Sequence, residues 1–120
     1  MSKWEYFSVE EMMCPCGCGK ADMNDSFMYK LVRVREELGK PMVVTSGYRC
    51  EEYNEKIGGV KNSAHTKGRA ADISITGMEE VDQVRLLEYA IHFNIRGLGI
   101  NDKKSHFIHL DDTRSRLWSY

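Results

Sequence analysis

Two short β-prone segments each place a residue with metal-binding chemistry opposite an apolar face. In residues 70–75, Asp72 points away from the face that the alternating aliphatic residues share, because successive side chains of a strand point to opposite sides. In residues 107–111, His109 alternates with aliphatic residues in the same way. If the two strands pair, Asp72 and His109 meet on the side of the sheet opposite the core.

A second histidine stands close enough in sequence to join them. His65 lies seven residues before Asp72, in a polar loop over 61–69 that can fold back over the same side. Two imidazoles and one carboxylate are a recurrent ligand set of catalytic zinc, and they leave the fourth tetrahedral position open for water. The spacing alone is also compatible with ordinary surface residues, since polar side chains of a strand are usually solvated.

The four cysteines form another group that could do chemistry. Cys14, Cys16 and Cys18 stand at alternate positions, and Cys50 lies far along the chain. Such a set can hold a structural zinc, although Cys-x-Cys-x-Cys is not the Cys-x2-Cys spacing of common zinc ribbons. A disulfide that involves Cys50 and a set of reduced thiols are the alternatives, and a cytoplasmic origin argues against obligatory disulfides.

Periodicity and capping signals predict the elements that position these residues. A capping box at residues 8–11 predicts a short first helix. An apolar stripe predicts a longer helix that Gly39 and Pro41 end, and this stripe consists of Phe27, Leu31, Val34 and Leu38. Four strands are predicted, at 42–46, at 70–75, around Leu98 and Ile100, and at 107–111. A short helix is predicted at 50–57. A capping box at Thr76 and Glu79 predicts another helix, which Val81, Val84, Leu87 and Ile91 continue. This mixture predicts an α+β fold, with a small, largely antiparallel sheet and helices packed on one face.

Length and charge limit the classes of function. The chain has 120 residues, which predicts one domain over residues 1–120. Seventeen basic residues nearly cancel eighteen acidic ones, so a broad basic surface for nucleic acid is not expected. No apolar run approaches the roughly 18 residues of a membrane span, and residues 1–6 contain no apolar signal core. We therefore expect a monomer without a membrane partner, made in the cytoplasm without a signal peptide.

Three segments together resemble a known family. Residues 63–72, Ser-Ala-His-Thr-Lys-Gly-Arg-Ala-Ala-Asp, fit the pattern Ser-x-His-x-x-Gly-x-Ala-x-Asp. Thr-Ser-Gly-Tyr-Arg-Cys stands upstream at 45–50, and Phe-Ile-His-Leu-Asp stands downstream at 107–111. In this order they resemble the zinc D-Ala-D-Ala carboxypeptidases and L-alanyl-D-glutamate endopeptidases of the M15 peptidase family, and most of all its short, single-domain, phage-like members. The resemblance covers roughly residues 5–112 and implies the fold of DD-peptidase and hedgehog-like domains.

The resemblance implies a role for each matching residue. His65, Asp72 and His109 would bind one catalytic Zn²⁺. Arg49 would bind a substrate carboxylate or stabilise the oxyanion, because its planar guanidinium stays charged and donates paired hydrogen bonds. Ser63 would donate to a ligand or to the substrate, and Gly68 would allow a sharp turn between the ligands.

The residues offer three candidates for the general base. Many relatives carry a carboxylate three residues before the last zinc ligand, where this chain has His106. A histidine can accept a proton near neutral pH. Residues three apart on a flat strand face opposite sides, so His106 can serve only from the loop before the strand or from a bulge. Asp102 and Asp111 are the alternative bases, and Asp111 could instead orient a ligand.

The resemblance implies zinc-dependent hydrolysis of a peptide bond in peptidoglycan stem peptides, the expected partners. Whether that bond is D-Ala-D-Ala or L-Ala-D-Glu stays open, and the expected setting is the cell wall after release, as for a bacteriophage endolysin. The alternatives are a non-catalytic zinc-binding or interaction domain of the same fold, and a redox or metal sensor built on Cys14 to Cys18. We also expect the cysteine loop to lie close to the start of the 50–57 helix and to support Arg49.

Overall fold

The computed structural model describes residues 4–120. Residues 1–3, which belong to the 1–6 segment in which no signal core was expected, lie outside the described residues. The elements in chain order are α1 (Val9–Met12), α2 (Asp25–Leu38), β1 (Val44–Ser46), α3 (Glu51–Lys56), the 3₁₀ turn η1 (Ala64–Lys67), β2 (Ala70–Ser74), α4 (Glu80–His92), β3 (Gly97–Asn101), β4 (Phe107–Asp111) and β5 (Arg116–Ser119). Among the described residues, no helix combines the length and the apolar character that crossing a membrane requires.

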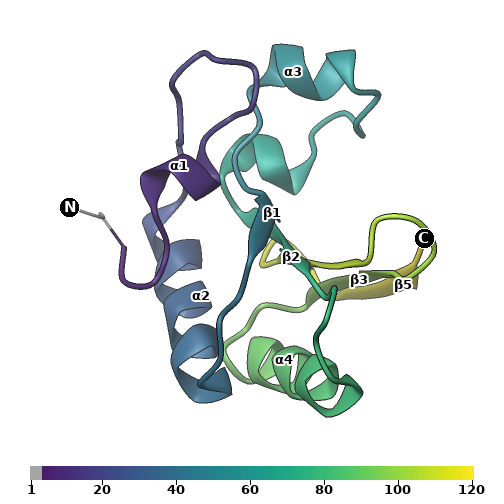
Figure 1. The fold of residues 1–120 in the computed structure, drawn as a ribbon. Coiled ribbons are helices and arrows are strands. Elements are labelled where there is room, and N and C mark those ends of the chain that lie inside the picture. Colours follow the sequence, from purple (N-terminus) through teal and green to yellow (C-terminus); the bar gives the residue numbers. More distant parts are fainter. Residues whose placement is uncertain (1–3) are drawn as a thin grey trace.

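The five strands form one sheet in the order β1-β2-β4-β3-β5 (Figure 1). The pairs β1–β2, β2–β4 and β3–β4 are antiparallel, and only β3–β5 is parallel. The predicted α+β class with a largely antiparallel sheet is therefore confirmed. The prediction that 107–111 is the last strand is wrong, because β5 follows it and extends the sheet beside β3.

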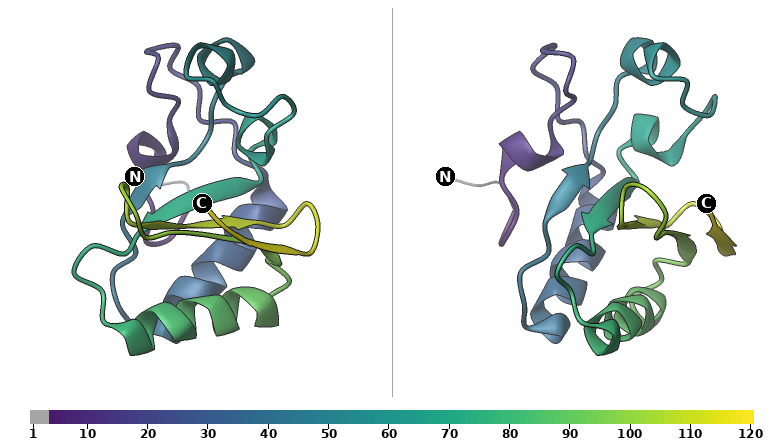
Figure 2. Two further views of the ribbon diagram at one scale, coloured as in Figure 1. Left: turned by 90° about the vertical axis from the view of Figure 1, so that its right-hand side faces the viewer. Right: turned by 45° about the vertical axis from the view of Figure 1, so that its right-hand side comes forward.

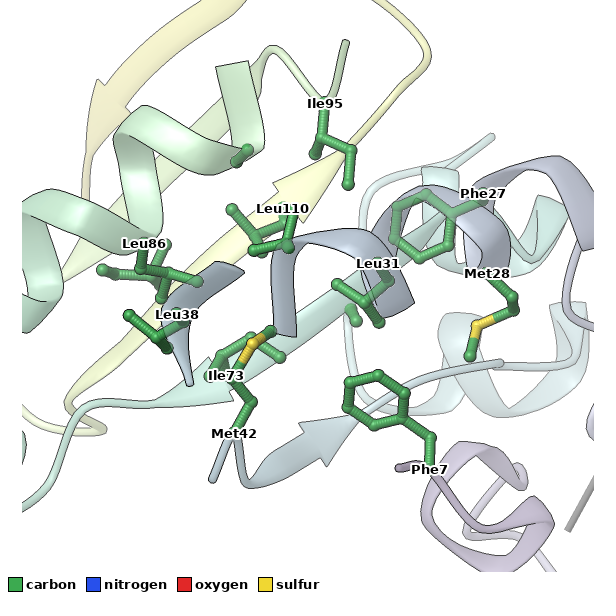
Figure 3. Packing of buried hydrophobic residues seen from close by; sticks show 14 of the residues in the cluster. Phe7, Phe27, Met28, Leu31, Leu38, Met42, Ile73, Leu86, Ile95 and Leu110 are labelled. Atoms are coloured by element: carbon green, nitrogen blue, oxygen red, sulfur yellow. The ribbon is translucent and has the colours of Figure 1, made fainter. Parts of the chain in front are cut away.

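The hydrophobic core lies between one face of this sheet and the two long helices. In Figure 2, α2 and α4 lie on one side of the sheet, whereas α3 and η1 lie on the other. Ile73 of β2 and Leu110 of β4 project into the core together with residues of both helices (Figure 3). The largest fully buried core side chains are Phe7, Met12, Phe27, Met28, Leu31, Val34, Ile73, Leu86, Ile95, Ile108 and Leu110.

Helix α2 forms as its sequence predicts. The side chain of Asn24 accepts a hydrogen bond from the backbone N–H of Phe27, and this satisfies one of the free amides of the first turn. Gly39 ends the helix in the left-handed conformation, with a φ of 67°. All four residues of the predicted stripe are buried, and they anchor the helix against the sheet.

Helix α4 corrects two predictions. Its N-cap is Glu79, and no side chain caps it, so the predicted capping box at Thr76 and Glu79 is wrong. The helix also buries a different face, because Val81 and Val84 are exposed whereas Leu86 and Ala90 are buried. The contacts with α2 and the sheet therefore decide which face turns inward, and helical periodicity alone does not.

Candidate metal centre

One row of residues crosses the sheet on the face opposite the core. Strand register places Ser46 of β1 opposite Asp72, Asp72 opposite His109, His109 opposite Gly99, and Gly99 opposite Trp118 of β5. The predicted pairing of the strands that carry Asp72 and His109 is thus confirmed. Their side chains meet directly because opposed residues of an antiparallel pair are the nearest cross-strand neighbours.

The turn η1 brings His65 over this row. The Ser63 hydroxyl accepts a hydrogen bond from the backbone N–H of His65 at 3.2 Å and so caps the turn. Gly68 ends it with a φ of 67°, and a Cβ at Gly68 would stand 2.8 Å from the Met23 Cα and 2.9 Å from the Asn24 nitrogen. The left-handed turn at Gly68, which was expected, and the close approach of this backbone to the start of α2, which was not, both require glycine.

The structure brings all three predicted ligand residues together. The His65 Nε2 lies 3.3 Å from the Asp72 Oδ1, and the His109 Nδ1 lies 3.0 Å from the same oxygen. One ligand atom from each of the three residues lies within 4.8 Å of the others, and all three residues are buried. Three ligands spread over a turn and two strands form one compact N, N, O donor set.

Hydrogen bonds on the far side of each imidazole fix its orientation. The His65 Nδ1 donates to the carbonyl of Gly47 at 2.7 Å, because a carbonyl oxygen can only accept. The His109 Nε2 donates to the Asp111 Oδ2 at 2.7 Å. These bonds leave the His65 Nε2 and the His109 Nδ1 facing Asp72, which is the arrangement of carboxylate- or carbonyl-oriented imidazoles around a metal ion. Asp111 thus orients His109, one of the two roles that its position in the sequence suggested.

Burial and hydrogen bonds shift the pKa values of two of the three residues in opposite directions. Burial raises the pKa of the Asp72 carboxyl, but hydrogen bonds with His109 and His65 outweigh burial and lower the pKa to about 2. Burial lowers the pKa of His109, but hydrogen bonds with Asp111 and Asp72 raise it to about 9. In the metal-free chain a proton on the His109 Nδ1 therefore faces Asp72, and binding a metal ion at these atoms requires its release.

The spacing of the donor atoms fits zinc. With metal–ligand distances of about 2.1 Å, two ligands of a tetrahedral zinc stand about 3.4 Å apart. The separations of 3.3 and 3.0 Å around the Asp72 Oδ1 are close to this value. Three protein ligands leave one tetrahedral position open, which is the arrangement of catalytic rather than structural zinc sites.

Arg49 borders the three ligand residues. Its Nη2 lies 3.6 Å from the Asp72 Oδ2, and its backbone N–H donates to the His65 carbonyl at 3.2 Å. The Arg49 Nε donates to the Ser46 hydroxyl at 3.2 Å, and its Nη1 donates to the Asn54 side-chain oxygen at 3.2 Å. Asn54 is buried on α3, and the sequence analysis missed it because nothing distinguishes it from the other polar residues of that helix.

His106 lies at the edge of this arrangement. It precedes β4 in the loop, as its predicted role requires, and adopts a φ of 44°, which is rare for a residue other than glycine. Its Nδ1 lies 3.0 Å from the Asp102 Oδ1, and its side chain is half exposed. The described hydrogen bonds thus join His106 to Asp102 and not to the three ligand residues, so its role as a base stays a prediction.

Two aromatic residues that were not predicted, Trp118 in β5 and Tyr120 directly after it, line this side of the sheet. The Trp118 ring centroid lies 5.1 Å from that of His109, and Tyr120 contacts Phe107 at 5.2 Å between centroids. Glycine on β3 makes room for Trp118, because a Cβ at Gly99 would stand 2.5 Å from the Trp118 ring. The alternation of glycine with aliphatic residues in 97–100 was the available signal that this face must accept bulky neighbours.

Comparison with known proteins identifies the class. The sequence model of the Peptidase M15 family matches residues 5–111, so this chain belongs to the M15 peptidase family. The chain is 33% identical over 96 residues to the peptidoglycan L,D-endopeptidase MepK of Escherichia coli K12, covering 74% of this chain and 50% of the relative. It is 43% identical over 47 residues to the zinc D-Ala-D-Ala carboxypeptidase of Streptomyces albus G, covering 38% of this chain and 18% of the relative. The chain thus spans half or less of the length of these relatives.

Proposed function

We propose that this chain is a zinc-dependent peptidase that hydrolyses a peptide bond in peptidoglycan stem peptides. The single observation that carries the proposal is the convergence of His65, Asp72 and His109 into one buried donor set. The M15 family supports peptidase chemistry, and the names of the two relatives, which describe peptidases of peptidoglycan and of D-Ala-D-Ala, support a cell-wall peptide as substrate. When bound, zinc supplies Lewis acidity and lowers the pKa of a bound water toward 7.

Arg49 is proposed to bind the substrate and to stabilise developing negative charge. Its guanidinium is held by Ser46 and Asn54 next to the ligand residue Asp72. A preorganised cation of this kind contributes most in a site that excludes water, and Arg49 is largely buried. A substrate carboxylate or the oxyanion of the attacked carbonyl would be its partner. Ser63 keeps its predicted role toward substrate as a proposal, although its hydroxyl already caps η1.

His106 is proposed to hold the proton that the attacking water gives up. Asp102 accepts a hydrogen bond from the His106 Nδ1, so the Nε2 is left to exchange a proton with the reaction. Asp111 is a poorer candidate for this role, because His109 and Thr113 already occupy both of its carboxylate oxygens. The same His106 would then return the proton to the leaving amine.

The proposed substrates are the two bond types that the family resemblance implies, D-Ala-D-Ala and L-Ala-D-Glu. Incubation of the zinc-loaded chain with purified muropeptides, followed by mass spectrometry of the fragments, reports both activity and the cleaved bond. We expect cleavage by the parent chain and none by His65→Ala. His92→Ala is the matched control, because His92 is an exposed histidine on α4 and its removal leaves the donor set intact.

The absence of any fragment from every muropeptide tested would contradict the proposal. A non-catalytic metal-binding domain of the same fold is the second candidate, and the half-exposed side chain of His106, which contacts Asp102, favours it. A chain that binds zinc through His65 but cleaves nothing would establish this second candidate.

A further inference from the structure

The four cysteines converge at a second place, on the opposite side of the sheet from α2 and α4. The Cys14 Sγ lies 3.5 Å from the Cys16 Sγ and 3.7 Å from the Cys50 Sγ, and the Cys16 and Cys50 sulfurs lie 3.6 Å apart. The Cys18 sulfur lies within 4.8 Å of the other three. The expectation that the cysteine loop lies at the start of α3 is confirmed, and Figure 1 shows this loop rising beside α3.

The separations of the sulfurs fit a shared metal ion. All four cysteines are free, and sulfurs 3.5–3.7 Å apart are not joined by disulfide bonds. Four thiolates around a tetrahedral zinc, each about 2.3 Å from the metal, stand about 3.8 Å from one another. Three of the sulfurs therefore already occupy positions close to the corners of such a tetrahedron.

The loop is shaped to turn alternate thiols inward. Gly17 and Gly19 have φ values of 89° and 78°, and nothing lies within 4 Å of a Cβ at either position. Their backbone conformation, and not a lack of space, therefore favours glycine. The Cys14 N–H donates to the Lys20 carbonyl at 2.9 Å and closes the loop. This geometry explains how a Cys-x-Cys-x-Cys spacing can present three sulfurs to one point.

Backbone amides point at two of the sulfurs. The Cys50 N–H donates to the Cys14 Sγ at 3.4 Å, and the Tyr53 N–H donates to the Cys50 Sγ at 3.4 Å. Such hydrogen bonds stabilise the negative charge of ligating thiolates and fix their direction. The amides belong to the start of α3, so the loop and this helix contribute to one site.

From this geometry we propose that Cys14, Cys16, Cys18 and Cys50 form a structural zinc site. Soft thiolate ligands select zinc over hard cations, and four protein ligands close the coordination sphere. The site differs in kind from the three-residue donor set of the sheet, and its existence does not rest on peptidase activity. A zinc ion bound there would link the 14–20 loop to the start of α3 through Cys50, the residue that follows Arg49.

Metal analysis of the full chain under reducing conditions tests the proposal. After zinc loading and removal of free metal, we expect about two zinc ions per parent chain and about one in His65→Ala. Cys16→Ser/Cys18→Ser, which alters two exposed residues, is also expected to retain about one. Combining all three substitutions is expected to remove both ions, and circular dichroism checks that each variant is folded.

Cobalt substitution identifies the ligands without relying on any cysteine variant. His65→Ala loaded with Co²⁺ is expected to show intense sulfur-to-metal charge-transfer absorption, and zinc is expected to protect its four thiols from alkylation until a chelator is added. Equal zinc content in the parent chain and Cys16→Ser/Cys18→Ser would overturn the proposal. Thiols that react at the same rate with and without zinc would also overturn it, as would disulfides that form in place of metal binding when zinc and oxygen are supplied together.

Discussion

The hydrogen bond between Asp111 and His109 allows a quantitative test of the sheet-face site, by which we mean the donor set of His65, Asp72 and His109. The Asp111 Oδ1 accepts from the Thr113 backbone N–H at 3.1 Å and from its hydroxyl at 2.8 Å, while the Oδ2 accepts from His109. Asp111→Asn keeps the shape but has only one acceptor oxygen. If that oxygen stays with Thr113, the new NH₂ faces the His109 Nε2, which must then accept, so the ring proton moves to the Nδ1 that faces Asp72. The variant thereby favours the tautomer that cannot bind a metal ion through the Nδ1.

We expect Asp111→Asn to weaken zinc binding by about 10- to 100-fold, which corresponds to about 1.4–2.7 kcal/mol. The assay is chelator competition followed by calorimetry in the Cys16→Ser/Cys18→Ser background, so that only the sheet-face site reports. Asp112→Asn is the matched control, because the neighbouring Asp112 carboxylate pairs with Lys30 and Arg69 and does not contact the donor set. A zinc Kd for Asp111→Asn within about twofold of the parent value would refute the orienting role of Asp111.

Three further predictions test His106 as the base, Arg49 as the residue that binds the substrate, and Gly68 as the residue that allows the turn after η1. His106→Ala is expected to retain zinc but to lower kcat by about 10² or more, and unchanged turnover would exclude His106 as the base. Arg49→Lys is expected to raise KM by about tenfold with zinc content unchanged, because lysine cannot donate two parallel hydrogen bonds; an unchanged KM would count against this role. Gly68→Ala is expected to cost about 1–2 kcal/mol for its left-handed backbone and a further ~1–3 kcal/mol for its clash with the start of α2. Gly77→Ala is the control, because Gly77 also has a positive φ but has open space around it. Chemical denaturation of this variant should show only the backbone cost of about 1–2 kcal/mol. Equal losses of unfolding free energy in the two variants would contradict the clash at Gly68.

The sequence permitted prediction of the parts of the fold that rest on local rules. The apolar stripe of α2 and the Gly39 stop are contained in one short segment, and each forms as predicted. Alternation in 70–75 and 107–111 was sufficient to place Asp72 and His109 on the face opposite the core, because a pairing register then brings them together. The position of His65 came instead from the family motif, since a mostly polar loop of nine residues has many possible paths.

Features that depend on tertiary contacts could not be predicted in this way. Strand β5 pairs in parallel with β3, and its residues 116–119 lack a clear apolar alternation, so neither the strand nor Trp118 was expected. Helix α4 packs against α2 and buries Leu86 and Ala90, and its Asp82 carboxylate accepts a hydrogen bond from the Lys40 ammonium at 2.7 Å. Asn54 supports Arg49 only because α3 folds back toward the site.

Zinc-edge anomalous diffraction from crystals of the zinc-loaded chain tests the central claim most directly. The account predicts an anomalous peak bounded by the His65 Nε2, the Asp72 carboxylate and the His109 Nδ1, with one coordination position free of protein atoms. Crystals that hold zinc elsewhere but show no peak among these three side chains would contradict it.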